Sequence, residues 1–304
     1  PYLFFVSGIT GLLGLALGPA VAPLAAVLIG LAFFFSYGFG QALTDCFQTD
    51  TDALSAPYRP LARGLIRSRD VMTVSLVGLL GVGVVLVANH LLNLPLVALA
   101  VAGLATYTWF KRRWWGGPFW NAWIVAALVL MGHVAATGAA SQPLVWPSAM
   151  PAALLATFFG YANFVLAGYF KDIAADRATD YRTFPVVFGR GPAVVASDMF
   201  AAAAVFFTFY TLRMGGLLRH ALTDPAILVF LILGVGLSLI AQVRLHRVTC
   251  DSQAHRSISL VVHAYILLLG ALVMAFETAW TLPVLAFYGA FIATLRLRPM
   301  KAQI

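Results

Sequence analysis

The acidic residues of this chain are scarce, and their spacing could hold a metal ion. Eleven acids occur in 304 residues, and six of them gather in two clusters. The clusters consist of Asp45, Asp50 and Asp52, and of Asp172, Asp176 and Asp180. On a helix, the set Asp45, Gln48 and Asp52 would form one stripe, and so would the second cluster. Like charges at that spacing repel one another unless a cation lies between them.

The oxygen atoms of these side chains favour a hard cation. Magnesium prefers carboxylate and amide oxygens and keeps open positions for substrate phosphates. We therefore predict Mg²⁺ as the cofactor, with metal ligands drawn from Asp45, Gln48, Asp52, Asp172, Asp176 and Asp180. Cations near the clusters could bind phosphate oxygens through charge-assisted hydrogen bonds. The candidates are Arg59, Lys111, Lys171 and Arg182. The alternative is a pair of solvated loops whose acids balance arginines, and two matched clusters make that alternative the weaker one.

The elements that must position these residues are transmembrane helices. The chain is 62% hydrophobic and 10% charged, whereas soluble domains carry about 25% charged residues. A spanning helix needs about 20 mostly apolar residues, and we expect a single all-α, polytopic domain over residues 1–304. Apolar runs predict spans near 2–17, 22–45, 71–91, 95–110, 119–138, 149–170, 192–212, 225–243, 257–276 and 281–295. The first and last runs are short, and the last could be interfacial. The chain opens without a charged leader, so we expect no signal peptide.

Basic residues predict the orientation of these spans. They concentrate in every second gap, as in the gap that holds Arg59 and Arg63 and the gap that holds Lys171 and Arg177. By the positive-inside rule those gaps are cytoplasmic, and both acidic clusters lie in them. The net charge of +8 therefore reports membrane orientation, and we expect no nucleic-acid partner. An integral membrane protein of a prokaryotic cell membrane fits this pattern.

Two longer motifs surround the acidic clusters. Residues 44–52 read TDCFQTDTD, and Pro57, Arg59, Pro60 and Gly64 follow. The second stretch begins at Lys171-Asp172, continues through Asp176 and ends at Thr183-Phe184-Pro185. These stretches resemble the two acidic motifs of the UbiA superfamily of intramembrane prenyltransferases, NDxxDxxxD with NxPxRPLxxG and KDxxxDxxxGxxTLP. A weaker third motif, Tyr107 followed by Lys111-Arg112, is similar to the family's Tyr with Lys-Arg.

The resemblance implies a fold and a reaction. The expected fold is nine core helices around a central cavity, with a short tenth helix added. The expected activity is Mg²⁺-dependent transfer of a prenyl group from an isoprenoid diphosphate to a lipophilic or aromatic acceptor, through an allylic carbocation, beside membrane lipid. The resemblance makes Asp45, Asp52, Asp172, Asp176 and Lys111 catalytic, and it adds Tyr107 and Arg112 to the diphosphate-binding candidates. The acceptor and the prenyl length stay open.

The sequence departs from the family's motifs at several positions. Thr44 replaces Asn, Gln48 replaces Asp, Ser55 replaces Asn and Asp180 replaces Gly. Gln48 still offers a neutral oxygen ligand but removes one negative charge from the first cluster. We therefore keep a terpene cyclase of the same superfamily as an alternative, in which the cation is captured by its own chain. A transporter is less well supported, because the sequence shows no internal repeat.

Aromatic side chains are further candidates for the cavity wall, because the face of a ring attracts a carbocation. The candidates are Tyr107, Phe158, Phe159, Tyr161 and Tyr169. Most aromatic residues in a membrane bundle serve packing and interfacial anchoring instead.

Overall fold

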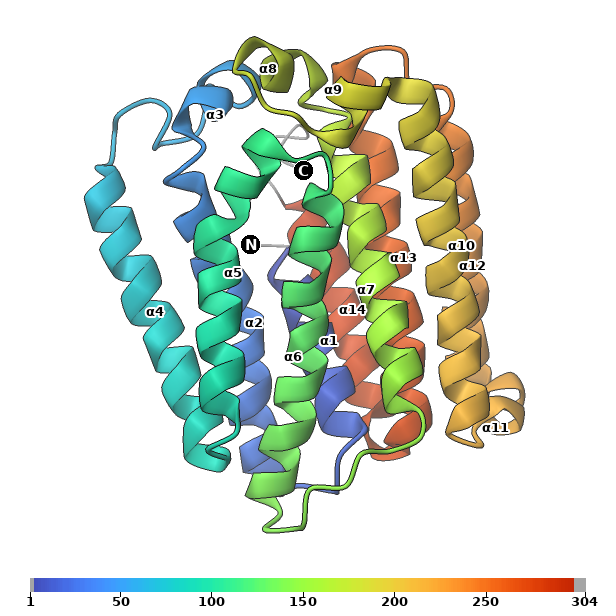
Figure 1. Ribbon diagram of the computed structural model, residues 1–304. Coiled ribbons are helices and arrows are strands. Elements are labelled where there is room, and N and C mark those ends of the chain that lie inside the picture. The colour runs from blue at the N-terminus through green and yellow to red at the C-terminus, as the bar shows by residue number, and fades with distance from the viewer. Residues whose placement is uncertain (1–2, 298–304) are drawn as a thin grey trace.

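The computed structural model describes residues 3–297, and its regular elements there are helices. Ten of these helices run along a common bundle axis (Figure 1). They are α1 (Phe4–Ala16), α2 (Pro23–Asp45), α4 (Ser68–Asn89), α5 (Asn93–Arg113), α6 (Gly117–Ala139), α7 (Met150–Tyr169), α10 (Arg190–Met214), α12 (Pro225–Leu245), α13 (His255–Phe276) and α14 (Thr281–Arg296). Each expected span thus corresponds to one helix. Backbone polar groups inside a bilayer must be satisfied within their own segment, which is why apolar runs form helices there.

Short helices lie at the two ends of the bundle. At one end are α3 (Thr49–Ser55), α8 (Ile173–Ala178), α9 (Phe184–Phe188) and the 3₁₀ turn η1 (Asp251–Gln253). Figure 1 shows α3, α8 and α9 together above the long helices. The opposite end carries α11 (Leu218–Thr223). Both acidic clusters therefore lie at the same end, as the charge pattern predicts.

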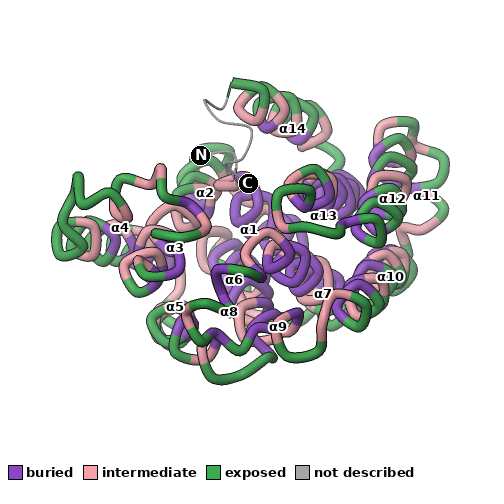
Figure 2. Tube along the Cα trace, turned by 90° about the horizontal axis from the view of Figure 1, so that it is seen from above, coloured by how far each residue is buried: buried purple, intermediate pink, exposed green. Residues whose placement is uncertain are grey.

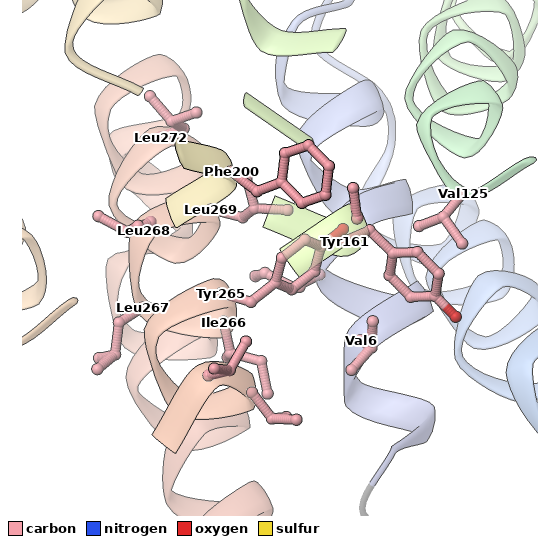
Figure 3. Packing of buried hydrophobic residues seen from close by; sticks show 14 of the residues in the cluster. Val6, Val125, Tyr161, Phe200, Tyr265, Ile266, Leu267, Leu268, Leu269 and Leu272 are labelled. Atoms are coloured by element: carbon pink, nitrogen blue, oxygen red, sulfur yellow. The ribbon is translucent and has the colours of Figure 1, made fainter. Parts of the chain in front are cut away.

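The tight core of the bundle surrounds α1, α6, α7 and α13. In the most hydrophobic 18-residue stretch of the segment that contains α13, 83% of the residues are buried, against 22% in that of α4. Thr10 of α1 hydrogen-bonds Tyr265 of α13 at 2.7 Å. The ring of Tyr265 lies 6.2 Å from that of Tyr161 on α7, within the packed cluster of Figure 3. Many residues of the outer helices are exposed (Figure 2). Large apolar residues are among them, as expected where a helix faces lipid.

The short helix of the bundle is the first one and not the expected tenth. Among the described residues, nine helices are long and apolar enough to cross a membrane, and they include the segment Thr278–Arg296 that contains α14. In the part of the chain that the structure describes, α1 is a shorter apolar helix of 13 residues. Yet α1 is almost entirely buried. In the most hydrophobic stretch of the segment that contains α14, only 11% of the residues are buried. The last segment, Thr278–Arg296, is therefore long enough to span, and α14 lies at the edge of the bundle (Figure 2).

Candidate active site

The two acidic clusters are not continuous helical stripes, contrary to the sequence expectation. Asp45 is the last residue of α2, and the chain turns before Asp52 appears in α3. In the second cluster, Asp172 precedes α8 and Asp176 lies within it. Asp180 follows the end of α8 in the left-handed region, at φ 59°. The breaks let each cluster fold back over the end of the bundle instead of extending it.

Arg59 joins the two acids of the first cluster. Its Nη1 lies 3.1 Å from Asp45 Oδ1 and 2.6 Å from Asp52 Oδ2. Gln41, one helical turn before Asp45, donates from Nε2 to Asp45 Oδ1 at 2.6 Å. Burial raises the pKa of Asp52, an effect that the positive charge of Arg59 opposes. Burial alone would lower the pKa of Arg59, but the negative charges of Asp45 and Asp52 raise that pKa overall. These three groups therefore form a charge cluster with a net negative charge.

Lys111 links the two clusters to each other. Its Nζ lies 3.2 Å from Asp176 Oδ1 and donates to Gln48 Oε1 at 3.3 Å. The ammonium also lies over the rings of Tyr169 and Tyr181, 5.2 Å and 4.9 Å from their centroids. Burial raises the pKa of Asp176, and Lys111 counteracts it. Lys111 therefore contacts one residue of each cluster: the neutral Gln48 of the first and the acidic Asp176 of the second.

A cavity of about 760 Å³ opens beneath these groups. Its polar end is lined by acids and cations from both clusters, and its deeper walls are apolar. The polar residues that line it include Gln41, Thr44, Asp45, Gln48, Asp52, Arg59, Tyr107, Lys111, Asn121, Tyr169, Lys171 and Asp172. Tyr107 and Tyr169 join their hydroxyls at 2.9 Å. The structure therefore brings most of the predicted site residues to the mouth of one apolar chamber.

Other predicted residues lie away from the cavity. Asp176 is fully buried behind Lys111, where Thr183 donates to its Oδ2 at 3.1 Å. Asp180 and Arg182 are exposed. Arg112 donates to Tyr181 at 3.1 Å and pairs with Asp50. Asp176 and Arg112 thus join neighbouring segments. The predicted roles of all four residues in binding metal or diphosphate stay predictions.

Some of the aromatic candidates line the cavity, and the others do not. Tyr107, Tyr161 and Tyr169 line the cavity, whereas Phe158 and Phe159 pack elsewhere.

Sequence reasoning missed several residues that support the site. Gln41 lies four residues before Asp45, a spacing that places two side chains on one face of a helix. Thr183 and Tyr181 follow the second cluster closely, but their contacts depend on a turn that spacing does not reveal. Thr51 and Thr179 share a hydrogen bond of 3.0 Å between α3 and α8. That contact holds the two acidic loops side by side.

The donor set fits magnesium. Asp45, Asp52 and Asp172 line the cavity with carboxylate oxygens, and Gln48 adds an amide oxygen. Within residues 3–297, no three His, Cys, Asp or Glu side chains lie close enough together to hold one ion. Magnesium usually takes one or two carboxylates and completes its shell with water and phosphate oxygens. Pairs of acids at the mouth of the cavity therefore satisfy what this ion needs from a protein.

Comparison with known proteins agrees with this geometry. The model of the UbiA prenyltransferase family matches residues 4–258. The chain therefore belongs to this family, and its apolar helices make it an integral membrane protein.

Relatives and solved structures share this fold. A digeranylgeranylglyceryl phosphate synthase from Halobacterium salinarum is 32% identical over 191 residues, which cover 63% of this chain and 66% of that protein, just under two thirds. The synthase from Thermococcus kodakarensis is 29% identical over 77% of this chain and 84% of its own length. A UbiA homologue from Aeropyrum pernix superposes with a TM-score of 0.72 at 20% identity, covering 97% and 98% of the two chains. One from Archaeoglobus fulgidus, bound to GPP and Mg²⁺, superposes at 0.59 with 20% identity over 88% and 95%.

Proposed function

We propose that this protein transfers a prenyl group from an isoprenoid diphosphate to a lipophilic or aromatic acceptor, with Mg²⁺ as cofactor. One observation carries the proposal. Acids from two distant loops converge with Arg59 and Lys111 at the mouth of an otherwise apolar cavity of about 760 Å³. A molecule with a multiply charged head and a long hydrocarbon tail matches both ends of that chamber.

The chemistry follows from this arrangement. The bond between the allylic carbon and the diphosphate oxygen breaks, and its electron pair leaves with the diphosphate. Arg59 and Lys111 can donate to the oxygens on which negative charge grows, and such preorganised contacts are often the largest contribution to catalysis. Bound Mg²⁺ would supply further positive charge at the leaving group. The acceptor then forms a bond to the allylic carbon and loses a proton.

The walls of the cavity protect the cation. Closing an active site to water prevents the hydrolysis of a reactive intermediate. The rings of Tyr107, Tyr161 and Tyr169 line the cavity below the charged mouth. An aromatic face attracts a cation with about 0.5–2 kcal/mol. These tyrosines can therefore stabilise the carbocation without providing a nucleophile that is ionised at neutral pH.

The relatives support the class of substrates. Homologues from Archaeoglobus fulgidus have been solved with DMAPP or GPP and Mg²⁺. The relatives from Halobacterium salinarum and Thermococcus kodakarensis are named for a glyceryl phosphate that bears two geranylgeranyl groups. A lipid alcohol is accordingly the first acceptor to test.

We further propose that residues 1–304 form one functional domain whose acidic loops face the cytoplasm of a prokaryotic cell.

Metal-dependent release of diphosphate tests the proposal. Purified protein with geranylgeranyl diphosphate, membrane extract and Mg²⁺ should release diphosphate, EDTA should stop the release, and added Mg²⁺ should restore it. Asp45→Ala should lower the rate at least 100-fold, because it removes a carboxylate that would hold Mg²⁺ beside the leaving group. Asp198→Ala is the matched control, because Asp198 pairs with His246 outside the cavity. Undiminished release in EDTA would refute the proposal.

A further inference from the structure

Asp251 joins three segments at the end of the bundle that carries the acidic loops. It begins η1, in the connection between α12 and α13, outside both acidic loops. Its Oδ2 accepts from the backbone N–H of Ala174 at 2.8 Å, and its Oδ1 pairs with Arg190, the first residue of α10. The side chains of Asp251 and Arg190 are 22% and 30% exposed. Two partners, one on each oxygen, therefore fix the orientation of a largely buried carboxylate.

The N–H of Ala174 is one that the chain's own N-cap residue usually binds. Asp172 stands at the N-cap of α8, and Ala174 is the second residue of that helix. An aspartate at an N-cap typically accepts from the N–H of the second or third helical residue. Asp224 does this for α12, where its Oδ1 accepts from both positions, at 2.9 and 3.1 Å. Within residues 3–297, the side chain of Asp172 makes no such bond, and Asp251 binds the N–H in its place.

The carboxylate of Asp172 is thereby left for the cavity. Asp172 lines the cavity mouth together with Asp45 and Asp52. Burial raises the pKa of Tyr58, the charge of Arg59 opposes this effect, and the charge of Asp172 raises the pKa further. Tyr58 follows the first acidic cluster and also lines the cavity. The Asp172 carboxylate therefore lies within electrostatic reach of the first acidic loop.

We infer that Asp251 is a positioning residue for the metal site, because it binds the N–H that otherwise draws the Asp172 carboxylate out of the cavity. Without Asp251, the N–H of Ala174 is open to Asp172, two residues earlier in the chain. A carboxylate bound there faces its own helix and is lost to the metal. This inference rests on the proposed function, which assigns Asp172 to Mg²⁺. It adds a residue from a third connection to the groups on which that site depends.

Binding of Mn²⁺, a paramagnetic substitute for Mg²⁺, tests the inference without turnover. The Kd is measured by electron paramagnetic resonance on the purified protein with inorganic diphosphate present. Asp251→Ala should raise this Kd about tenfold or more, as is typical when a group that orients a metal ligand is removed. At saturating Mg²⁺ the rate of diphosphate release should fall less than about threefold, because bound metal returns Asp172 to the cavity.

Asp224→Ala is the matched control. It also removes an aspartate that caps a helix, but Asp224 follows α11 at the opposite end of the bundle (Figure 1). The loss of a cap should lower thermal stability, and the Kd for Mn²⁺ should stay unchanged.

A double-mutant cycle with Asp172→Ala distinguishes positioning from general support of the fold. If Asp251 acts through Asp172, Asp251→Ala should raise the Kd less than about twofold in a protein that already carries Asp172→Ala. Arg190→Ala releases the Asp251 carboxylate from one of its two partners. It should raise the Kd about threefold, again only while Asp172 is present. This variant carries the test alone if Asp251→Ala does not fold.

The outcomes separate the two claims. If the unaltered protein binds no Mn²⁺ with diphosphate, or if Asp172→Ala leaves the Kd unchanged, the metal site of the proposed function fails. If Asp172→Ala weakens binding but Asp251→Ala does not, the inference fails. It also fails if Asp251→Ala weakens binding equally in the presence and absence of the Asp172 carboxylate.

Discussion

Lys111 and Asp176 form an ion pair that is nearly sealed from solvent, with Nζ 3.2 Å from Oδ1 and side-chain exposures of 5% and 0%. The other oxygen of Asp176 accepts from Thr183, and the ammonium also donates to Gln48. Removing one partner of a buried pair leaves an uncompensated charge and costs about 3–5 kcal/mol. The pair therefore couples the stability of the second acidic loop to the cation at the mouth of the cavity.

The first prediction separates these two roles of Lys111. Lys111→Met should lower both the thermal stability in detergent and the rate of diphosphate release, because it leaves Asp176 buried and unpaired. The double variant Lys111→Met with Asp176→Asn should recover stability, since neither charge then remains. Its activity should stay at least 100-fold reduced. A double variant with normal turnover would show that Lys111 does not act on the diphosphate.

The second prediction concerns Gln48. Replacing it with aspartate places an anionic oxygen beside Asp52 and Lys111, where a neutral oxygen now lines the cavity. If Gln48 contributes to the metal site, Gln48→Asp should lower the Mg²⁺ concentration that gives half-maximal activity about threefold to tenfold, since harder, charged oxygens bind this ion more tightly. Gln142→Asp, in an exposed segment at the other end, is the control. An unchanged metal requirement and product would place Gln48 outside the metal shell.

The third prediction concerns orientation. Single cysteines at Ser55 and Thr179, in a protein whose Cys46 and Cys250 are replaced by serine, should react with a membrane-impermeant thiol reagent from the cytoplasmic side. The charge clusters of both loops predict that side. A cysteine at Gln142 should react from the opposite side. Labelling of Ser55 and Thr179 positions from different sides would contradict a site built from both loops.

Much of the fold could be read from the sequence, because apolar length alone predicts a spanning helix. Each of the ten expected runs became a helix, and the charge pattern placed both acidic clusters at one end. The shape of the clusters could not be read in this way. Spacing suggested continuous stripes, but the chain turns between Asp45 and Asp52, and Asp180 adopts a left-handed conformation.

The partners of the site residues were also beyond the sequence. Asp176 faces Lys111, which lies on another helix far away in the chain, and this buried pairing leaves Asp172 to line the cavity. Spacing along one segment carries no information about such a contact.

The dependence of turnover on an acceptor is the most direct test of prenyl transfer. Ionisation of the donor needs the same charged mouth in a transferase and in a cyclase, so variants of the acids cannot separate them. A transferase must hold a second molecule beside the allylic carbon, and that positioning sets its rate. Purified protein with farnesyl or geranylgeranyl diphosphate and Mg²⁺ alone should therefore release diphosphate slowly. Membrane extract from the native host should raise the release at least tenfold and yield a prenylated product, whereas rapid conversion to a cyclic hydrocarbon or alcohol without any acceptor would contradict the account.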